Sequence, residues 1–153
     1  MTDRSHEAYC GLYCGACPVL LQRKADWLYR AAREDYAETE ADLLCKGCRS
    51  DVISVSCRDC PKRDCAQSKG FDSCAACPDM PCGLLSFRLP HGAEMVPNLK
   101  ALRDRGSEAW LAEQVDRWRC VSCGRTGSWY EQTCSECGAP LPSGFETPAE
   151  LLR

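Results

Sequence analysis

Long apolar segments are absent from this sequence of 153 residues, and aromatic side chains are scarce. No window approaches the roughly 18 consecutive apolar residues that a membrane-spanning helix needs, so we expect no membrane association. Aromatic residues make up 8% of the chain, and its mean hydropathy is -0.38. The apolar core must therefore be limited, and part of the folding free energy has to come from another source.

Residues that commonly perform catalysis are also rare. His6 and His91 are the only histidines, and neither stands in a motif typical of a nucleophile or of a metal-dependent hydrolase. No glycine-rich phosphate-binding loop is present either. The sequence thus contains no identifiable catalytic site, which favours a binding or structural role over an enzymatic one.

A secretory signal is not recognisable in residues 1–9, which are polar and mixed in charge. We therefore expect a cytoplasmic protein, and disulfide bonds rarely persist in that reducing compartment. The number of cysteines is also odd, so complete disulfide pairing would leave one thiol over. Both points argue against a disulfide scaffold.

Cysteine, by contrast, is abundant and arranged in close pairs and triples. Six pairs are separated by two residues, a spacing that lets one tight turn direct two sulfurs at the same metal ion. All fifteen cysteines are candidate metal ligands: Cys10, Cys14, Cys17, Cys45, Cys48, Cys57, Cys60, Cys65, Cys74, Cys77, Cys82, Cys120, Cys123, Cys134 and Cys137. We expect two to four zinc ions, whose binding would supply the missing folding free energy.

Positive charge is in slight deficit, because the formal net charge is -3 with neutral thiols. Each zinc ion held by four thiolates adds roughly -2, so a loaded protein would be clearly acidic. That balance disfavours broad binding to nucleic-acid phosphates, which needs a basic face. The partner that we expect is a protein, and the sequence does not indicate an oligomeric state.

The spacing of cysteines and of helical patterns divides the chain into four parts. Leucines and alanines recur with helical spacing after Pro18, and no further proline or glycine interrupts the segment before Gly47. We predict a mainly α-helical fold with irregular, metal-organised loops and a C-terminal β-hairpin zinc ribbon. Its predicted parts are a cysteine-rich metal-binding domain at 1–97 with one long helix at about 18–44, a helical connector at 98–118, the zinc ribbon at 119–140 and a tail at 141–153.

Two Cys-x-x-Cys-Gly knuckles near the C-terminus, nine residues apart, indicate the zinc ribbon. The glycine after each pair supplies the positive φ that closes a knuckle beneath a metal ion. The ligands would be Cys120, Cys123, Cys134 and Cys137, with Trp129-Tyr130 on a strand between them. Four thiolates leave zinc no open position, which predicts a structural site. Rubredoxin-type iron has the same geometry and is the main competitor.

Eleven cysteines in residues 10–82 do not divide into groups of four. Two four-cysteine sites leave three thiols, and three sites need one outside ligand. That ligand would be His6 or His91, and clusters with shared thiolates are a further solution. An iron–sulfur cluster bound by these cysteines, in electron transfer or in redox or metal sensing, is the first alternative to zinc.

The first cysteine triple also matches two enzymatic patterns. Its spacing is that of the cluster motif in radical S-adenosylmethionine enzymes, but those need a partial α/β barrel of roughly 200 residues, so this interpretation is rejected. Cys14 and Cys17 at a predicted helix start would suit a thiol oxidoreductase, because a helix N-terminus lowers a thiol pKa. The preceding strand and βαβ context of such enzymes are missing, so this second alternative is the weaker one.

The ordered string of motifs resembles a known family. It comprises Cys10-Gly-Leu-Tyr-Cys14-Gly-Ala-Cys17-Pro18, a helix, Cys45-x-Gly-Cys48, Cys60-Pro-Lys-Arg-Asp-Cys65-Ala66, Lys69-Gly70 and Cys74-Ala-Ala-Cys77-Pro-Asp-Met-Pro-Cys82. This order is similar to that of the cysteine-rich prokaryotic family named domain of unknown function 3795, over roughly residues 8–90. Cys57 is additional to the usual pattern, and some members append a similar ribbon. The resemblance implies metal binding and no assigned reaction.

The sequence therefore predicts a multi-zinc structural or binding protein that acts as an adaptor, with no identifiable catalytic site. An iron–sulfur protein and a thiol oxidoreductase that uses Cys14 and Cys17 remain as alternatives.

Overall fold

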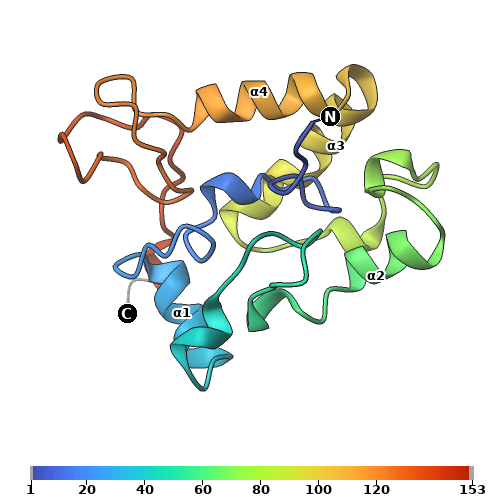
Figure 1. Cartoon of the computed structure of the whole chain (residues 1–153), viewed down its shortest axis with the longest axis horizontal. Coiled ribbons are helices and arrows are strands. Elements are labelled where there is room, and N and C mark those ends of the chain that lie inside the picture. The colour runs from blue at the N-terminus through green and yellow to red at the C-terminus, as the bar shows by residue number, and fades with distance from the viewer. Residues whose placement is uncertain (1, 152–153) are drawn as a thin grey trace.

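Four α-helices provide most of the regular structure of residues 2–151, the part of the chain that the computed structural model describes (Figure 1). They are α1 (Trp27–Asp35), α2 (Pro61–Ser68), α3 (Met95–Arg105) and α4 (Ser107–Arg117). Short 3₁₀ helices lie between and beyond them: η1 (Cys14–Ala16), η2 (Glu40–Leu43), η3 (Val55–Cys57), η4 (Cys74–Ala76), η5 (Gly83–Leu85), η6 (Pro90–Glu94) and η7 (Ala149–Leu151). The prediction of a small, mainly helical protein is confirmed.

The ends of two predicted parts lie outside the described residues. These are Met1, at the start of the cysteine-rich domain, and Leu152 and Arg153, at the end of the tail.

The prediction of one long helix at about 18–44 is wrong. Helix α1 has nine residues, and it follows turns in which Gln22 adopts a positive φ of 57°. The helix begins at Trp27 because the carboxylate of Asp26 accepts a hydrogen bond from the Leu28 amide at 2.8 Å. The Leu28 amide lies in the first turn and has no backbone acceptor within the helix, so the Asp26 carboxylate takes the place of that acceptor.

The flanks of the predicted long helix instead fold back onto α1. Val19 before the helix and Leu43 after it form a small buried cluster with Tyr29 and Ala32. The apolar residues in this segment are therefore buried by chain reversal rather than by one extended helical face. Helical spacing alone could not distinguish these two solutions.

Helices α3 and α4 meet at Gly106, whose φ of 83° ends the first helix and precedes the second. Glycine suits the end of a helix because it adopts a positive φ without strain, and both helices overlap the predicted helical connector at 98–118. Helix α3 begins earlier than the pattern indicated, at Met95, and includes Pro97 in its first turn. Proline is tolerated there because its missing amide hydrogen would have no helical partner.

The main core lies between these two helices and the N-terminal segment, which runs through the middle of the molecule (Figure 1). Trp110 of α4 is fully buried and meets the ring of Tyr13 edge-on, with centroids 6.1 Å apart. Asn98 of α3 donates a hydrogen bond to the carbonyl oxygen of Gly11 at 2.9 Å. Gly11 has a φ of 86°, and an added Cβ would lie 2.8 Å from the Met95 carbonyl oxygen. The N-terminal cysteine triple is thereby held directly against the core.

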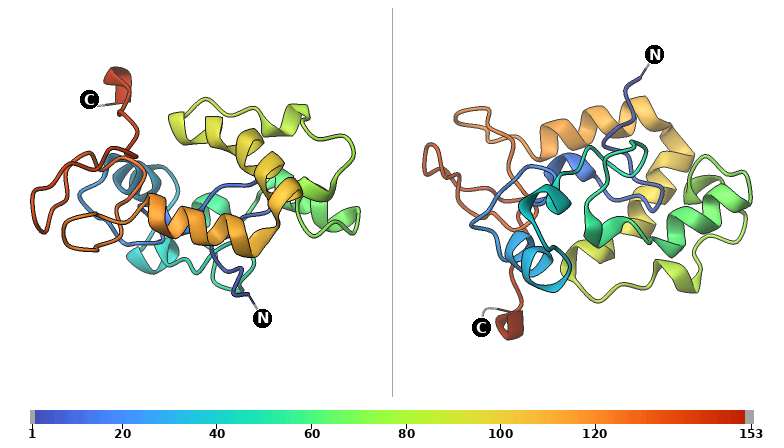
Figure 2. Two further views of the ribbon diagram at one scale, coloured as in Figure 1. Left: turned by 90° about the horizontal axis from the view of Figure 1, so that it is seen from above. Right: turned by 60° about the horizontal axis from the view of Figure 1, so that its bottom comes forward.

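The segment 119–140 lies at one end of the molecule beside α1, while α2 lies at the other end (Figure 2). Trp129 and Tyr130 attach it, because both are buried in the main core. The Trp129 amide donates to the carbonyl oxygen of Ala16 at 2.9 Å, and the Tyr130 ring meets that of Trp27 at a centroid distance of 4.8 Å. The two aromatic residues therefore join the C-terminal segment to the cysteine-rich N-terminal part.

His91 completes this junction from η6. Its ring stacks on Trp129 at a centroid distance of 4.4 Å, and its Nδ1 lies 2.6 Å from the Tyr130 hydroxyl oxygen. The Tyr130 hydroxyl also accepts a hydrogen bond from the His91 amide at 3.3 Å. Burial lowers the pKa of His91 to about 4, so the ring is neutral at physiological pH.

Among the helices of residues 2–151, none is both long enough and apolar enough to cross a membrane.

The burial of His91 predicts a pH-dependent stability. Below about pH 6.5 the unfolded chain binds a proton on His91 that the folded chain excludes until about pH 4. The free energy of unfolding should therefore fall on acidification from pH 7.5 to 5.5, with about 1 kcal/mol of the loss due to His91. Denaturant unfolding at both pH values should show a loss smaller by that amount in His91→Gln. Equal losses in the two proteins would contradict this role of His91.

Candidate metal centre

The four cysteines of the two C-terminal knuckles form a compact sulfur cluster. Their sulfur atoms all lie within 4.8 Å of one another. The Sγ atoms of Cys120 and Cys137 are 3.6 Å apart, as are those of Cys123 and Cys134. A tetrahedral zinc ion at about 2.3 Å from each sulfur requires sulfur separations of about 3.8 Å, whereas a disulfide requires about 2.0 Å. The cluster can therefore bind a metal ion such as zinc.

Backbone amides in each knuckle favour the thiolate form that a metal ion requires. The amides of Cys137 and Glu136 point at the Cys134 sulfur and lower the pKa of this thiol to about 6. The amides of Cys123 and Ser122 likewise lower the pKa of Cys120. Hydrogen bonds to the charged form stabilise it before any metal ion arrives.

The glycine after each knuckle is required by the backbone rather than by crowding. Gly124 and Gly138 have φ values of 78° and 75°, and an added Cβ would contact nothing at either position. Their amides donate to the carbonyl oxygens of Cys120 and Cys134, each at 2.8 Å, which closes the turns. The predicted function of these glycines is consistent with this geometry.

The β-hairpin of the predicted ribbon is not supported, because residues 2–151 contain no β-strand. Isolated bridges, Arg119–Thr126 and Thr133–Pro140, instead close each knuckle on itself. The expected strand at Trp129-Tyr130 does not form. Both rings are buried in the main core, and their burial draws the loop between the two knuckles away from a hairpin path. The Trp129 carbonyl accepts from the Phe145 amide at 2.6 Å, which brings the tail against this loop.

An ion pair within the loop between the two knuckles helps to fix the shape of that loop. Arg125 donates two hydrogen bonds to the carboxylate of Glu131, at 2.8 and 3.1 Å. Arg23 donates to the carbonyl oxygen of Thr126 at 2.7 Å. Sequence reasoning missed these residues, and a charge pair six residues apart in an irregular loop carries no recognisable signal.

The eleven N-terminal cysteines are also free thiols, but their sulfurs are less tightly grouped. Among the described residues, the four C-terminal cysteines are the ones that meet the 4.8 Å spacing. Cys10 is buried, Cys57 and Cys82 are exposed, and the others lie between these extremes. The structure thus brings the predicted ribbon ligands together and leaves the N-terminal ligand sets wider.

Neither histidine joins the compact sulfur cluster found among the described residues. His91 packs between Trp129 and Phe87 at the junction described above. His6 meets the ring of Tyr13 edge-on, with centroids 6.0 Å apart. His91 is thus occupied by aromatic packing, whereas a ligand role for His6 stays a prediction, since the His6 carbonyl oxygen accepts a hydrogen bond from the Cys14 amide at 2.8 Å.

Cys14 and Cys17 lack the setting that thiol exchange needs. Cys14 begins the three-residue helix η1 and Cys17 directly follows it, and this helix is too short to provide the N-terminus of an α-helix. Burial raises the pKa of Cys17 to about 12, and it raises the pKa of Cys14 well above the ordinary value. A redox-active pair instead needs a lowered pKa and exposure.

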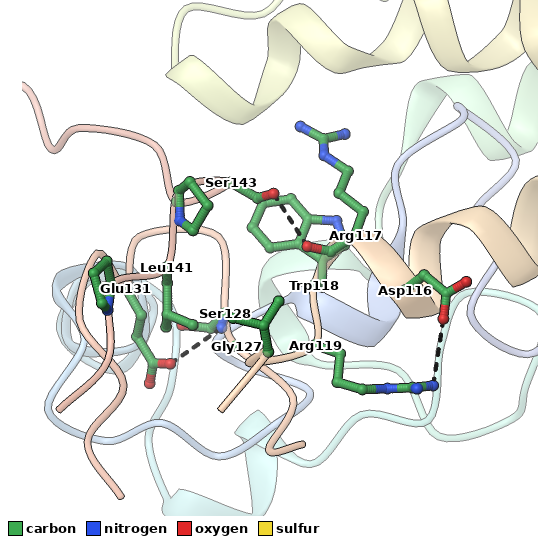
Figure 3. A pocket seen from close by; sticks show the side chains of 13 residues that line it. Asp116, Arg117, Trp118, Arg119, Gly127, Ser128, Glu131, Leu141 and Ser143 are labelled. Atoms are coloured by element: carbon green, nitrogen blue, oxygen red, sulfur yellow. Dashed lines mark hydrogen bonds and ion pairs between the residues drawn. The ribbon is translucent and has the colours of Figure 1, made fainter. Parts of the chain in front are cut away.

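A shallow pocket lies where α4 meets the C-terminal segment (Figure 3). Ser143 donates to the carbonyl oxygen of Arg117 at 3.1 Å on one side, and Glu131 accepts from the Ser128 amide at 3.2 Å on the other (Figure 3). The cavity has a volume of about 70 Å³, whereas sites for small molecules usually measure about 300–1,000 Å³. Its size suits a few water molecules better than a substrate.

The cluster predicts that Cys137→Ser removes one metal ion per chain. Cys137 is exposed, so the loss of a thiolate should dominate over any loss of packing. We expect the free energy of unfolding to fall by more than about 4 kcal/mol, as for other losses of a structural metal. Native mass spectrometry and denaturant unfolding measure both effects. Val121→Ser, which changes a 92% exposed side chain in the other knuckle of the same cluster, should keep the ion and is the control.

Comparison with known proteins gives a family for the N-terminal part. Searches of curated proteins and of solved structures found no significant match. The profile of the family described as "Protein of unknown function (DUF3795)" matches residues 6–87, which include all eleven N-terminal cysteines and end before the C-terminal cluster. Because this match spans more than half of the chain, the protein belongs to the DUF3795 family.

Proposed function

We propose that the protein is a multi-zinc adaptor, in which two to four zinc ions hold the fold and the surface binds a protein partner. The observation that carries this proposal is the C-terminal sulfur cluster, with its 3.6 Å separations. Four thiolates saturate a tetrahedral ion and leave no position for substrate or water, so this site would be structural.

The position of the cluster supports a stabilising function. Its buried members, Cys120 and Cys134, pack with Leu141 in a small apolar cluster of their own. The loop between the two knuckles carries Trp129 and Tyr130 into the main core. A zinc ion that fixes both ends of this loop would therefore also fix the junction with the N-terminal part.

Binding is favoured over catalysis by the pocket and by the histidines. The cavity of about 70 Å³ is small for a metabolite. His91, the buried histidine, is held by Tyr130 and Trp129, and its lowered pKa of about 4 removes it from the range of a general base at neutral pH. These features support a role through surface contacts.

A protein is the proposed partner because of the charge. Zinc-bound thiolates would make the net charge more negative than -3, which opposes binding to nucleic-acid phosphates. Leu84 and Phe87, beside α2, are 42% and 45% exposed and offer apolar contact area. Lys62 of α2 lies over the Phe87 ring, at 5.5 Å from its centroid. A mixed apolar and charged surface of this kind suits a protein partner.

Metal analysis tests the nature of the bound ions. The full chain, purified without added metal and without oxygen, should contain two to four zinc ions and no iron. It should be colourless, since iron–sulfur clusters give a brown protein with broad visible absorbance. Iron in the protein, or fewer than two metal ions per chain, would reject the zinc proposal, and iron would support the electron-transfer or sensing alternative.

Thiol titration tests the oxidoreductase alternative. In the native, metal-loaded protein, Cys14 and Cys17 should be unreactive because they are ligands with buried sulfurs. After denaturation with a chelator, all fifteen thiols should react. Rapid modification of Cys14 or Cys17 in the loaded protein, located by peptide mapping, would instead favour thiol exchange.

A further inference from the structure

Each knuckle of the C-terminal cluster has an inner and an outer cysteine. The inner ones are Cys120 and Cys134, which are 1% and 2% exposed and pack with Leu141 in a small apolar cluster. The outer ones are Cys123 and Cys137, which are exposed. A small solute can therefore reach one cysteine of each knuckle, while the other cysteine is covered by protein.

Each outer cysteine lies beside the inner cysteine of the opposite knuckle. The Sγ atoms of Cys137 and Cys120 are 3.6 Å apart, and so are those of Cys123 and Cys134. The sulfurs of a disulfide are about 2.0 Å apart, so each pair needs an approach of about 1.6 Å. Cysteines that sense oxidants are typically exposed and lie next to a second, resolving thiol that attacks the oxidised sulfur. The cluster contains this combination twice.

A bound zinc ion would keep all four sulfurs in their reactive form. A thiol that coordinates a metal ion is deprotonated. The thiolate, and not the thiol, is the nucleophile that attacks an oxidant or a second sulfur. The difference in reactivity between outer and inner cysteines then follows from their exposure alone.

The exposed cysteines of the N-terminal part differ from those of the cluster. Cys57 and Cys82 are exposed as well. The sulfurs of residues 10–82, however, are less tightly grouped in the part of the chain that the structure describes. After oxidation, Cys57 or Cys82 would need a larger movement before a disulfide could form. We therefore expect the C-terminal cluster to form disulfides first.

We propose that the C-terminal cluster is a site of reversible oxidation by peroxides, an inference that rests on the proposed zinc function. Peroxide converts the four zinc-bound thiolates into two disulfides, one between Cys120 and Cys137 and the other between Cys123 and Cys134. The zinc ion is released, so the modification regulates the proposed adaptor through its structural metal.

The oxidation takes two steps at each pair. The Cys137 thiolate attacks one oxygen of hydrogen peroxide, so that a sulfur–oxygen bond forms, the oxygen–oxygen bond breaks and hydroxide leaves. The product is a sulfenic acid, whose sulfur has lost two electrons to the peroxide. The Cys120 thiolate then attacks this sulfur, the disulfide bond forms and a second hydroxide leaves. A second peroxide reacts in the same way at Cys123 and Cys134, and the ion dissociates because no thiolate ligand remains.

The two disulfides would close the same loop that the ion closes. Both join one knuckle to the other, and the loop between Cys123 and Cys134 contains Trp129 and Tyr130. The covalent links therefore preserve the burial of these two rings in the main core after zinc has left. The charge changes instead, because a zinc ion with four thiolates carries about -2 and two disulfides carry none. Oxidation thus changes the electrostatics of the C-terminal segment without unfolding it.

Zinc release and disulfide mapping test the proposal on the intact, zinc-loaded chain. Hydrogen peroxide is added in increments, and released zinc is measured with a chromophoric chelator. We expect the first zinc ion to leave after about two molecules of peroxide have reacted per chain. Tryptophan fluorescence should stay that of the folded protein, and dithiothreitol with added zinc should restore the loaded form.

The tryptic peptides distinguish the two possible kinds of pairing. Trypsin cleaves after Arg119 and Arg125, so the knuckles fall in separate peptides, 120–125 and 126–153. Free thiols are blocked before digestion without reductant. Disulfides between knuckles join the two peptides, whereas disulfides within a knuckle leave them separate. We expect the joined form, with the individual pairs assigned by fragmentation.

Cys134→His is a variant that separates metal binding from oxidation. Histidine is a zinc ligand, so the site keeps four ligands, but Cys123 loses its resolving thiol. Peroxide should then form only the disulfide between Cys120 and Cys137. Val121→Ser, which changes a 92% exposed side chain in the first knuckle, should form both disulfides as the wild type does and is the control.

The outcomes separate this inference from the proposed function. Disulfides within a knuckle, zinc loss without any disulfide, unfolding on release, or earlier loss of ions from residues 10–82 would overturn the inference. A loaded chain that keeps its zinc in peroxide would also overturn it, and all these results leave the zinc adaptor intact. Iron, or fewer than two metal ions, in the purified chain would reject both.

Discussion

Mutual repulsion among closely packed thiolates is the constraint on which this structure depends. In the C-terminal cluster, sulfurs approach to 3.6 Å, and backbone amides already lower the pKa of Cys134 to about 6. Thiolates at that separation are unfavourable unless a cation lies between them. In the N-terminal part, where the sulfurs are less tightly grouped, burial instead raises the pKa of Cys10, Cys14 and Cys17, which favours their neutral thiol form. The two parts thus differ in how closely their sulfurs are grouped and in which form of the thiol the surroundings favour.

The aromatic junction transmits the effect of the C-terminal site to the rest of the fold. Trp129 and Tyr130 are placed by a loop whose two ends are the knuckles, and they contact His91, Trp27 and the Ala16 backbone. With aromatic residues at 8% of the chain, these rings are a large share of the available apolar surface. A site that fixes the loop therefore stabilises more of the protein than its own segment.

The sequence predicted the composition of the sites better than the path of the chain. The two Cys-x-x-Cys-Gly knuckles identify their ligands because two-residue spacing and a positive-φ glycine are local requirements, which can be read from each knuckle's own residues. The predicted hairpin was not supported because the position of Trp129 depends on a core more than 100 residues away in sequence, at Ala16. The long helix failed for a similar reason, since burial of Val19 and Leu43 against α1 is a tertiary contact that helical spacing cannot reveal. The packing role of His91 was likewise invisible, because a lone histidine gives no local signal.

Loop closure is the cost that a metal ion in the N-terminal part would offset. The segments at 10–17, 45–48 and 57–60 are separated by up to roughly 30 residues, and closing such loops costs conformational entropy. Polar anchors such as Arg49 with Glu7 offset part of this cost and bring the sulfurs near one another. These anchors do not bring the sulfurs to the spacing of metal ligands, because each hydrogen bond contributes only about 1 kcal/mol net to stability. An ion that binds ligands from all three segments at once closes several loops in one step.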